Sequence, residues 1–580
     1  MAKNVREWIT KKQLQKRYPW LTDAMISAYL PKQKHGLVNG QPETLAWPRR
    51  EIIAFCSSNK RLLAAKKRAA EAHQRLEEER QARKAFVLQF TPERKFLYAR
   101  RLDRRFVLHV GPTNSGKTYT AMEALKQGRN GVYLGPLRLL ALEMFDKLNG
   151  SGHACSLLTG EESIPIPGAA FTASTIEMAD MRTRYDVAVI DEAQMISDPD
   201  RGSHWLDAIC RIDAETVHVC LALEAEEVIR DVIEKIGAPC EVVRHERLAP
   251  LIAGTPVMDF LDIHPNDAVI AFSRKAVLGI AGSLEQRGLK PAVIYGSLPP
   301  ASRRTEVAKY TSGECDVVVA TDAIGMGVSL PIRRIVFSEL QKYDGKKVRP
   351  LTHSEILQIA GRAGRYGMFD VGEVSAIGSM KPVLAALNGT PASIKKIRIA
   401  FPGEEVIASE CSLQGVIEEW QKLPQEDWYD REDMSDALFL LKCFPSRRLK
   451  VDKELMYKLI TCPLDIGNQA IVDYWGRCAL AIVHGNDLPT PNFGLLTLEK
   501  CETQYRALDL YHHLCVRFDR TDYCGKFRDE VVRRIAALLK ESKDDYIRTC
   551  SRCGCELPIS FSSRDRLCAK CRRLVLSGRG

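Results

Sequence analysis

The chain has 580 residues, of which 45% are hydrophobic and 27% charged, so it is long enough for several globular domains. No apolar run approaches the ~20 residues that would cross a bilayer, and we expect no membrane association. The net charge of +11 is unevenly spread, because residues 1–105 hold 25 Lys and Arg against 10 Asp and Glu, whereas the centre is mildly acidic. Basic ends suit modules that hold a polyanion, with solvated surface charge as the alternative.

The first part of the chain has a helical pattern. Residues 1–58 contain short helical segments around a turn-rich piece, which predicts a helix-turn-helix or winged-helix module. Residues 59–94 are rich in Ala, Lys, Arg and Glu without a heptad seam, which predicts a charged linker helix.

From Phe106 onward, short apolar strands alternate with helical segments, a pattern typical of βαβ units and parallel sheets. The expected strands are FVLHV, GVYLG, VAVID, VIAF, AVIYG, VVVATD and RIVFSE. We therefore expect an α/β fold with two tandem domains at 95–250 and 251–400, a helical domain at 401–545 and a small module at 546–580.

A phosphate-binding loop follows the strand FVLHV. The segment GPTNSGKT lies between this strand and a helical stretch, the setting that the P-loop pattern requires. Backbone N–H groups of such a loop wrap phosphates, Lys117 can reach the β- and γ-phosphates, and the Thr118 hydroxyl can bind Mg²⁺. The expected nucleotide-binding residues are Gly111, Pro112, Thr113, Asn114, Ser115, Gly116, Lys117 and Thr118.

Two adjacent carboxylates end the apolar strand YDVAVI. Asp191 and Glu192 would be costly at the tip of a buried strand unless a cation or a reacting water uses them. We expect Asp191 to help hold Mg²⁺ and Glu192 to polarise the attacking water, so the loop and the acidic pair together predict nucleotide hydrolysis.

The second α/β group supplies cationic residues. The segment QIAGRAGR places Gln358, Arg362 and Arg365 together, and arginines there can reach across a cleft to stabilise a transferring phosphoryl group. The strand VVVATD runs into a turn that contains Gly325, expected beside the nucleotide. Hydrolysis would then depend on closure of the two domains.

Eight segments occur in the order expected of one family. They are GPTNSGKT, PLRLLALE, TASTIEM, DEAQMISDPDRG, FSRK, VIYGSLPP, ATDAIGMG and QIAGRAGR. Together they resemble the motor motifs of superfamily 2 helicases. The residues within them are most similar to those of the RNA helicases of the mitochondrial degradosome and their bacterial relatives. The resemblance covers roughly residues 95–540.

This resemblance implies two RecA-like domains, ATP with Mg²⁺, and 3′-to-5′ movement along single-stranded or partly duplex RNA, with DNA sometimes also opened. It implies a role in RNA processing or decay and an exoribonuclease partner. The residues that it places on the nucleic-acid track are Arg138, Thr172, Thr175, Ser273, Arg274 and Thr321.

One segment departs from the family pattern. Where the family has a Gly-Glu-Pro-like stretch, the chain reads Leu221-Ala-Leu-Glu224, with Glu224 as the acidic candidate. Two alternatives therefore stay open: a DNA or nucleoprotein translocase that remodels without processive unwinding, and a nucleic-acid-binding adaptor with a degenerate motor.

The last segment contains two pairs of cysteines. Cys550 and Cys553 are separated by fourteen residues from Cys568 and Cys571, close to the spacing of structural zinc sites, and Cys555 is a spare ligand. Two such pairs predict a tetrahedral Zn²⁺ site, with free thiols as the alternative.

Cysteine usage also bears on compartment. The chain has 18 Cys and an N-terminus without a secretory pattern, which indicates a reducing compartment. We expect a cytoplasmic protein of bacterial or phage-like context, with the mitochondrial matrix as the alternative.

Overall fold

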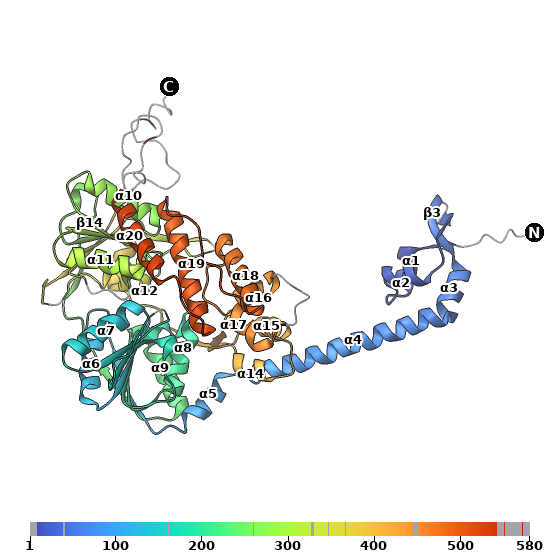
Figure 1. The fold of residues 1–580 in the computed structure, drawn as a ribbon, viewed down its shortest axis with the longest axis horizontal. Coiled ribbons are helices and arrows are strands. Elements are labelled where there is room, and N and C mark those ends of the chain that lie inside the picture. The colour runs from blue at the N-terminus through green and yellow to red at the C-terminus, as the bar shows by residue number, and fades with distance from the viewer. Residues whose placement is uncertain are drawn as a thin grey trace, which may run out of the picture. The chain divides into compact units, whose positions relative to one another are not determined.

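The computed structural model describes residues 8–541 apart from 39–40, 161, 259, 326–329, 346, 366 and 445–450, together with Cys550 and Cys571. The chain divides into two compact units, at residues 1–89 and 90–580, which are described separately. Figure 1 shows both units along the chain.

The first unit combines a small antiparallel sheet with helices. Its sheet has the strand order β1-β3-β2, and its two short helices are joined by a five-residue turn. The elements are β1 (Trp8–Thr10), α1 (Lys11–Arg17), α2 (Asp23–Tyr29), β2 (Lys34–Val38), β3 (Gln41–Pro48), α3 (Arg49–Ser58) and α4 (Lys60–Val87). Helix α4 covers most of the predicted linker, and it groups with the preceding elements.

The second unit begins with an eight-stranded sheet of order β11-β4-β10-β9-β5-β8-β6-β7, in which only β7 runs antiparallel to its neighbour. The strands are β4 (Arg105–Val110), β5 (Gly131–Gly135), β6 (Cys155–Leu158), β7 (Ser163–Ile164), β8 (Phe171–Thr175), β9 (Arg184–Ile190), β10 (Asp213–Leu221) and β11 (Cys240–Arg244). The helices are α5 (Pro92–Ala99), α6 (Lys117–Gln127), α7 (Arg138–Gly150), α8 (Gly202–Arg211) and α9 (Glu226–Ile236).

The next domain has a six-stranded parallel sheet of order β12-β19-β16-β13-β15-β14. Its strands are β12 (Leu251–Ala253), β13 (Asp267–Ile270), β14 (Pro291–Ile294), β15 (Val317–Ala320), β16 (Arg334–Phe337) and β19 (Gly372–Ala376), with a separate hairpin of β17 (Gln341–Tyr343) and β18 (Val348–Pro350). Its helices are α10 (Arg274–Glu285), α11 (Pro300–Thr311), α12 (His353–Ala360) and α13 (Lys381–Asn388).

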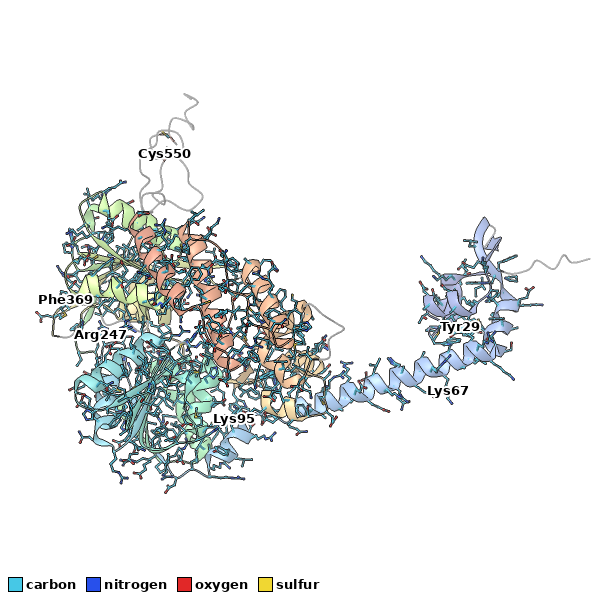
Figure 2. All side chains as sticks on the ribbon, viewed as in Figure 1. Tyr29, Lys67, Lys95, Arg247, Phe369 and Cys550 are labelled. Carbon is cyan, nitrogen blue, oxygen red and sulfur yellow. The ribbon has the colours of Figure 1, made fainter. Side chains whose placement is uncertain are left out.

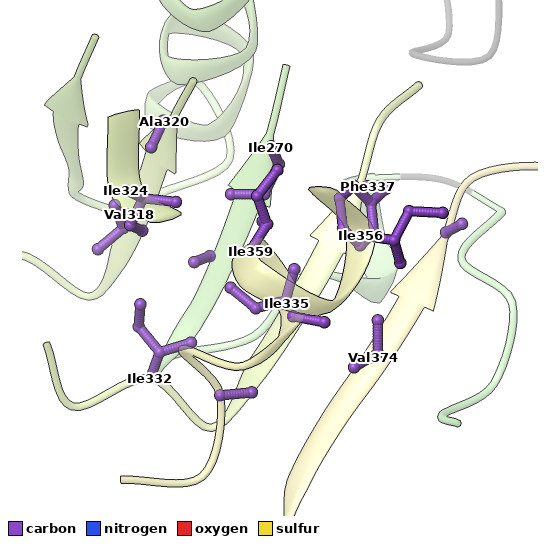
Figure 3. Packing of buried hydrophobic residues seen from close by; sticks show 14 of the residues in the cluster. Ile270, Val318, Ala320, Ile324, Ile332, Ile335, Phe337, Ile356, Ile359 and Val374 are labelled. Carbon is purple, nitrogen blue, oxygen red and sulfur yellow. The ribbon is translucent and has the colours of Figure 1, made fainter. Parts of the chain in front are cut away.

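The core of this second sheet explains why its strands read as continuous apolar runs. Ile270, Val318 and Ile335 come from neighbouring strands and pack against Ile356 and Ile359 of α12, as Figure 3 shows. A parallel sheet is covered on both faces, so both sides of each strand are apolar. The prediction of two tandem α/β domains with parallel sheets is confirmed.

A mainly helical region completes the described chain, as predicted. It contains a short two-stranded sheet of β20 (Ile397–Ile399) and β21 (Tyr429–Arg431). Its helices are α14 (Gly403–Ala408), α15 (Leu413–Lys422), α16 (Ser435–Cys443), α17 (Lys453–Ile460), α18 (Gln469–Val483), α19 (Leu498–Arg517) and α20 (Gly525–Glu541). Among the described helices, none combines the length and the apolar character needed to cross a bilayer.

Candidate active site and nucleic-acid cleft

The loop between β4 and α6 depends on glycine and on left-handed backbone. Asn114 and Gly116 have φ values of 63° and 81°, and the chain turns there into the first residue of α6. A Cβ on Gly111 would lie 2.4 Å from the carbonyl oxygen of His245, so glycine alone fits this close approach. The loop geometry matches a phosphate cradle at a helix N-terminus.

Lys117 lies at the mouth of this loop. Its Nζ donates hydrogen bonds to the carbonyl oxygens of Gly111 at 2.7 Å and Pro112 at 2.6 Å. Burial lowers the pKa of the Lys117 ammonium, while Glu192 and Asp191 oppose that shift. The ammonium is thus held where the β- and γ-phosphates of a bound nucleotide would lie.

Asp191 follows β9 and lies beside the first turn of α6. The Thr118 hydroxyl lies 3.2 Å from both carboxylate oxygens, and the Tyr133 hydroxyl donates to one of them at 2.9 Å. Burial, reinforced by Glu192, raises the pKa of Asp191 to about 6. A divalent cation held by Thr118 and Asp191 would favour the ionised carboxylate, so this donor set fits Mg²⁺.

Gln194 connects the acidic pair to the next strand. Its side-chain amide donates to Glu192 and accepts from the backbone N–H of Ala222 at 3.1 Å. Ala222 belongs to the segment that departs from the family pattern, and the carbonyl of Glu224 accepts from the N–H of Ile394 at 2.7 Å. The departing segment therefore contacts both the acidic strand end and the chain beyond the second domain through its backbone.

Arg362 faces this site from the second α/β domain. Its guanidinium donates to the carbonyl of Gly325 at 3.1 Å and 2.5 Å. Burial lowers the pKa of Arg362, while the nearby charges of Glu192 and Asp191 raise it. Gln358 lies on α12 against Gly325, and Arg365 follows three residues after Arg362. The predicted nucleotide-site residues of both domains thus gather around one interface.

Arg247 was not singled out from the sequence, yet it joins the two domains at this interface. Its guanidinium donates to the carbonyls of Thr113 at 2.8 Å and Gly361 at 3.0 Å, and also to Ala249 and Ala363. Burial lowers its pKa to about 10. Figure 2 shows Arg247 where the two α/β domains meet. Asn114 adds a second link by donating to the carbonyl of Gly364 at 2.6 Å.

Three histidines form a row beneath the loop. His109 is hydrogen bonded to His245 at 3.0 Å and to His218 at 2.9 Å, from three neighbouring strands or strand ends. Burial lowers the pKa of His109 to about 4, so this imidazole is neutral at physiological pH. The row supports the loop because His245 makes the close approach to Gly111.

A cleft of about 810 Å³ is lined by residues other than those of the phosphate-binding loop. Its walls come from the first α/β domain, the second α/β domain and the helical region, where α19, Ile471 of α18 and the segment after α17 line it. Four arginines line it: Arg138, Arg201, Arg303 and Arg506. A cleft with several guanidinium groups fits a phosphodiester backbone.

The residues that the resemblance placed on the track lie in different settings. Arg138 and Thr175 line the 810 Å³ cleft, whereas Thr172 lines a separate cleft of about 440 Å³. Thr321 is buried at the end of β15 and accepts from the N–H of Ala323. Arg201, Arg303 and Arg506 were not expected on the track. Arg201 lies near the end of the segment DEAQMISDPDRG, and the other two lie outside the eight motif segments.

Ser273 and Arg274 have structural partners. The Ser273 hydroxyl accepts from the N–H of Ala276 and caps α10, while Arg274 forms an ion pair with Glu502 of α19. Tyr295 donates to the same carboxylate at 2.7 Å. Arg274 thus ties the second α/β domain to the helical region.

A phosphate-binding loop and an acidic strand end on one parallel-sheet domain, faced by an arginine of a second such domain, are the parts of a two-domain nucleoside-triphosphate-hydrolysing motor, as in the helicases. Residues 92–245 match the family model described as the DEXQ-box helicase domain of Suv3, and residues 255–367 match the helicase conserved C-terminal domain. The chain belongs to the SUV3 family of ATP-dependent RNA helicases.

Known relatives support this assignment. The chain is 34% identical to the mitochondrial DExH-box ATP-dependent RNA helicase DExH16 of Arabidopsis thaliana, over 74% of this chain and 79% of that protein. It is 37% identical to the mitochondrial ATP-dependent RNA helicase SUV3 of Oryza sativa subsp. japonica, over 71% of this chain and 74% of that protein. It is 43% identical to the mitochondrial ATP-dependent RNA helicase SUPV3L1 of Danio rerio, over 50% of this chain and 40% of that protein.

These relatives correct one expectation. A cytoplasmic protein of bacterial or phage-like context was expected, because cysteine usage reports a reducing environment and does not separate one such compartment from another. The relatives are mitochondrial helicases, so that expectation was wrong and the mitochondrial alternative is favoured.

The predicted zinc module falls largely outside the described residues. Cys550 and Cys571 are described and are 2% and 4% exposed, whereas Cys553 and Cys568 lie outside the described part of the chain.

Proposed function

We propose that this helicase moves 3′-to-5′ along single-stranded RNA and opens duplexes ahead of it during RNA processing or decay. The observation that carries the proposal is Arg362 of the second RecA-like domain, which faces Asp191 and Glu192 of the first. Hydrolysis at such a site depends on both domains, so it can be coupled to their relative movement. The direction of movement and an exoribonuclease partner rest on the family resemblance alone.

The chemistry is assigned to side chains at the domain interface. Thr118 and Asp191 would hold Mg²⁺, which when bound neutralises charge on the β- and γ-phosphates. Lys117 binds the same phosphates, and Glu192, positioned by Gln194, orients the attacking water. Arg362 stabilises charge on the transferring phosphoryl group, and Arg365 is assigned the same task.

The track is assigned to the 810 Å³ cleft. Arg138 and Thr175 hold the strand from the first RecA-like domain, Arg303 from the second, and Arg506 from α19. Contacts of guanidinium and hydroxyl groups with phosphate and sugar carry no base preference, as a motor that steps over any sequence requires.

The function is tested by ATP hydrolysis in the presence and absence of single-stranded RNA. RNA should stimulate hydrolysis in the wild type, and Lys117→Ala should abolish it because the phosphates lose their cation. Arg129→Ala is the matched control, since Arg129 forms an exposed ion pair with Asp186 away from the loop. Hydrolysis that responds neither to RNA nor to Lys117→Ala would leave the adaptor alternative.

Direction and unwinding require a second readout. Labelled duplexes with 3′ or 5′ single-stranded overhangs, in RNA and DNA versions, should show strand release from the 3′-overhang RNA duplex. Release from the 5′-overhang duplex alone would reverse the direction. RNA-stimulated hydrolysis without strand release from any duplex would favour the translocase or remodeller.

We propose in addition that Cys550, Cys553, Cys568 and Cys571 hold one structural Zn²⁺. The support is their spacing and the burial of Cys550 and Cys571. Elemental analysis of the purified full chain should find about one zinc per chain, as a four-cysteine site binds a single ion. Cys568→Ser should lower that content, whereas Cys240→Ser, at an exposed cysteine, should not. Metal-free wild-type protein would contradict the assignment.

A further inference from the structure

The second short helix of the first unit, α2, has an exposed face made of small side chains. On α2, the exposed side chains include Ala24, Ser27 and Ala28, all small. Asp23 at its start is also exposed, but Lys11 of α1 forms an ion pair with it at 3.0 Å and Gln15 donates to it at 2.7 Å. A helix with this face can approach another surface closely.

The opposite face of α2 is fixed to the unit. Ile26 packs in a core with Leu14 of α1, Trp47 of β3 and Leu62 of α4. The Thr22 hydroxyl caps the helix by accepting from the N–H of Met25, and Gln15 also donates to the carbonyl of Leu21. The two helices and the turn between them are therefore attached to one core, with α2 as the exposed helix.

The beginning of α4 adds a basic stripe beside the end of α2. Arg61, Lys67 and Arg68 line a shallow cleft of about 550 Å³ together with Tyr29, Ala64 and Glu71. The arginines are seven residues apart, so they lie on one face of the helix. Among the described residues, neither arginine has an acidic group within ion-pair distance, whereas Lys67 lies 3.9 Å from Glu71. Figure 2 marks Tyr29 and Lys67 on this surface.

The rest of α4 differs in its charge. From Glu71 onward the helix carries acidic residues that pair within the helix, as in the Arg80–Glu77 and Arg83–Glu79 pairs. Between Lys60 and Ala70 there are five cationic side chains and no acidic one. The excess of positive charge is therefore concentrated where α4 meets α2. Charges that served only to solvate the helix would not need to gather there.

We propose that residues 8–87 form a binding module for B-form duplex DNA. Helix α2 enters the major groove, and Arg61, Lys67 and Arg68 contact the phosphates that border it. An α-helix is about 10–12 Å wide and the B-DNA major groove about 12 Å wide, so the small side chains of α2 can reach the base edges. The major groove of A-form RNA is too narrow for a helix, which is why DNA is the assigned duplex. The proposal does not depend on the motor.

The test measures binding of a labelled blunt DNA duplex to the full chain by fluorescence anisotropy. Saturating unlabelled single-stranded RNA and ADP occupy the motor domains, so the change in anisotropy measures DNA binding by residues 8–87. Arg61→Ala/Arg68→Ala should weaken binding on the order of tenfold and reduce the slope of log affinity against log salt by about 1.8, at about 0.9 per phosphate contact. Its RNA-stimulated ATP hydrolysis should equal that of the wild type.

Arg80→Ala/Lys84→Ala removes the same charge from another face of α4 and should bind DNA as the wild type does. A second variant, Ala24→Glu/Ser27→Glu, adds negative charge to the exposed face of α2 and should abolish binding while the circular dichroism spectrum is unchanged. The proposal is overturned if Arg61→Ala/Arg68→Ala loses no more affinity than the control. It is also overturned if a blunt RNA duplex of the same sequence binds as tightly as DNA.

Discussion

Arg247 concentrates several interdomain contacts in one side chain. One guanidinium donates to carbonyls of the phosphate-binding loop and of the segment that carries Arg362. A hydrogen bond from a charged group contributes about 1.5–3 kcal/mol. Arg247 therefore positions the two halves of the active site relative to each other without touching the reacting phosphate.

We expect Arg247→Ala to lower kcat for RNA-stimulated ATP hydrolysis about tenfold, because a loss of about 1.4 kcal/mol from a rate-determining arrangement gives that factor. The affinity for ATP should change less, since Lys117 and the loop backbone remain. Both quantities are measured by steady-state kinetics, with Arg244→Ala as the control. This control separates the loss of the interdomain hydrogen bonds from the loss of a nearby charge, because Arg244 makes an exposed ion pair with Glu226. Equal kcat values for the two variants would contradict the role of Arg247.

Helix α19 links the helical region to the motor. Near its start, the buried Glu502 accepts from Arg274 and Tyr295 of the second RecA-like domain. Two turns later, Asp509 lines the 810 Å³ cleft, as Arg138 does, and Arg528 of α20 forms an ion pair with Asp509. Burial raises the pKa of Asp509, while Arg528 and Arg138 oppose that shift. The same helix thus contacts the second RecA-like domain and lines the 810 Å³ cleft.

We expect Glu502→Gln to lower the midpoint of thermal unfolding and the rate of strand release. Removing one partner of a buried ion pair is strongly destabilising, by about 3–5 kcal/mol, because the remaining charge stays buried. Glu499→Gln is the control, since Glu499 is 78% exposed and lies 3.9 Å from the same arginine. Differential scanning calorimetry and the overhang assay measure both effects. A midpoint unchanged by Glu502→Gln would show that α19 is not held by this pair.

Across the whole molecule, the sequence predicted those features that depend on residues close together in the chain, such as strands and the motif loops that follow them. Strands β4, β9 and β15 end in mainly apolar runs, and the loops that follow them carry the motif residues, so these features were found. Strands β8 and β10 were not among the expected strands, since FTAST and DAETVHVCL mix polar residues into buried strands of the sheet. These strands are buried because adjacent strands and helices cover them in the folded sheet, and the local sequence does not show those contacts.

Contacts between distant segments could not be predicted from the sequence either. Arg247 resembles any cation in a connecting segment, and its acceptors are backbone carbonyls 134 and 114 residues away. Arg274 has its partner 228 residues away, on a helix outside the eight motor-motif segments. Carbonyl acceptors carry no residue signature, and a single acidic residue on a long helix has no local pattern that marks it as buried.

The position of α19 has a thermodynamic consequence. This helix is bound to the second RecA-like domain and also lines the cleft, so if RNA occupies the cleft as proposed, its binding and the spacing of the ATP-binding halves are coupled through α19. Linkage is reciprocal, so the factor by which RNA changes the affinity for ATP must equal the factor by which ATP changes the affinity for RNA. Each ligand is then an effector of the other, and a change at Glu502 that weakens the coupling reduces both of these effects by one common factor.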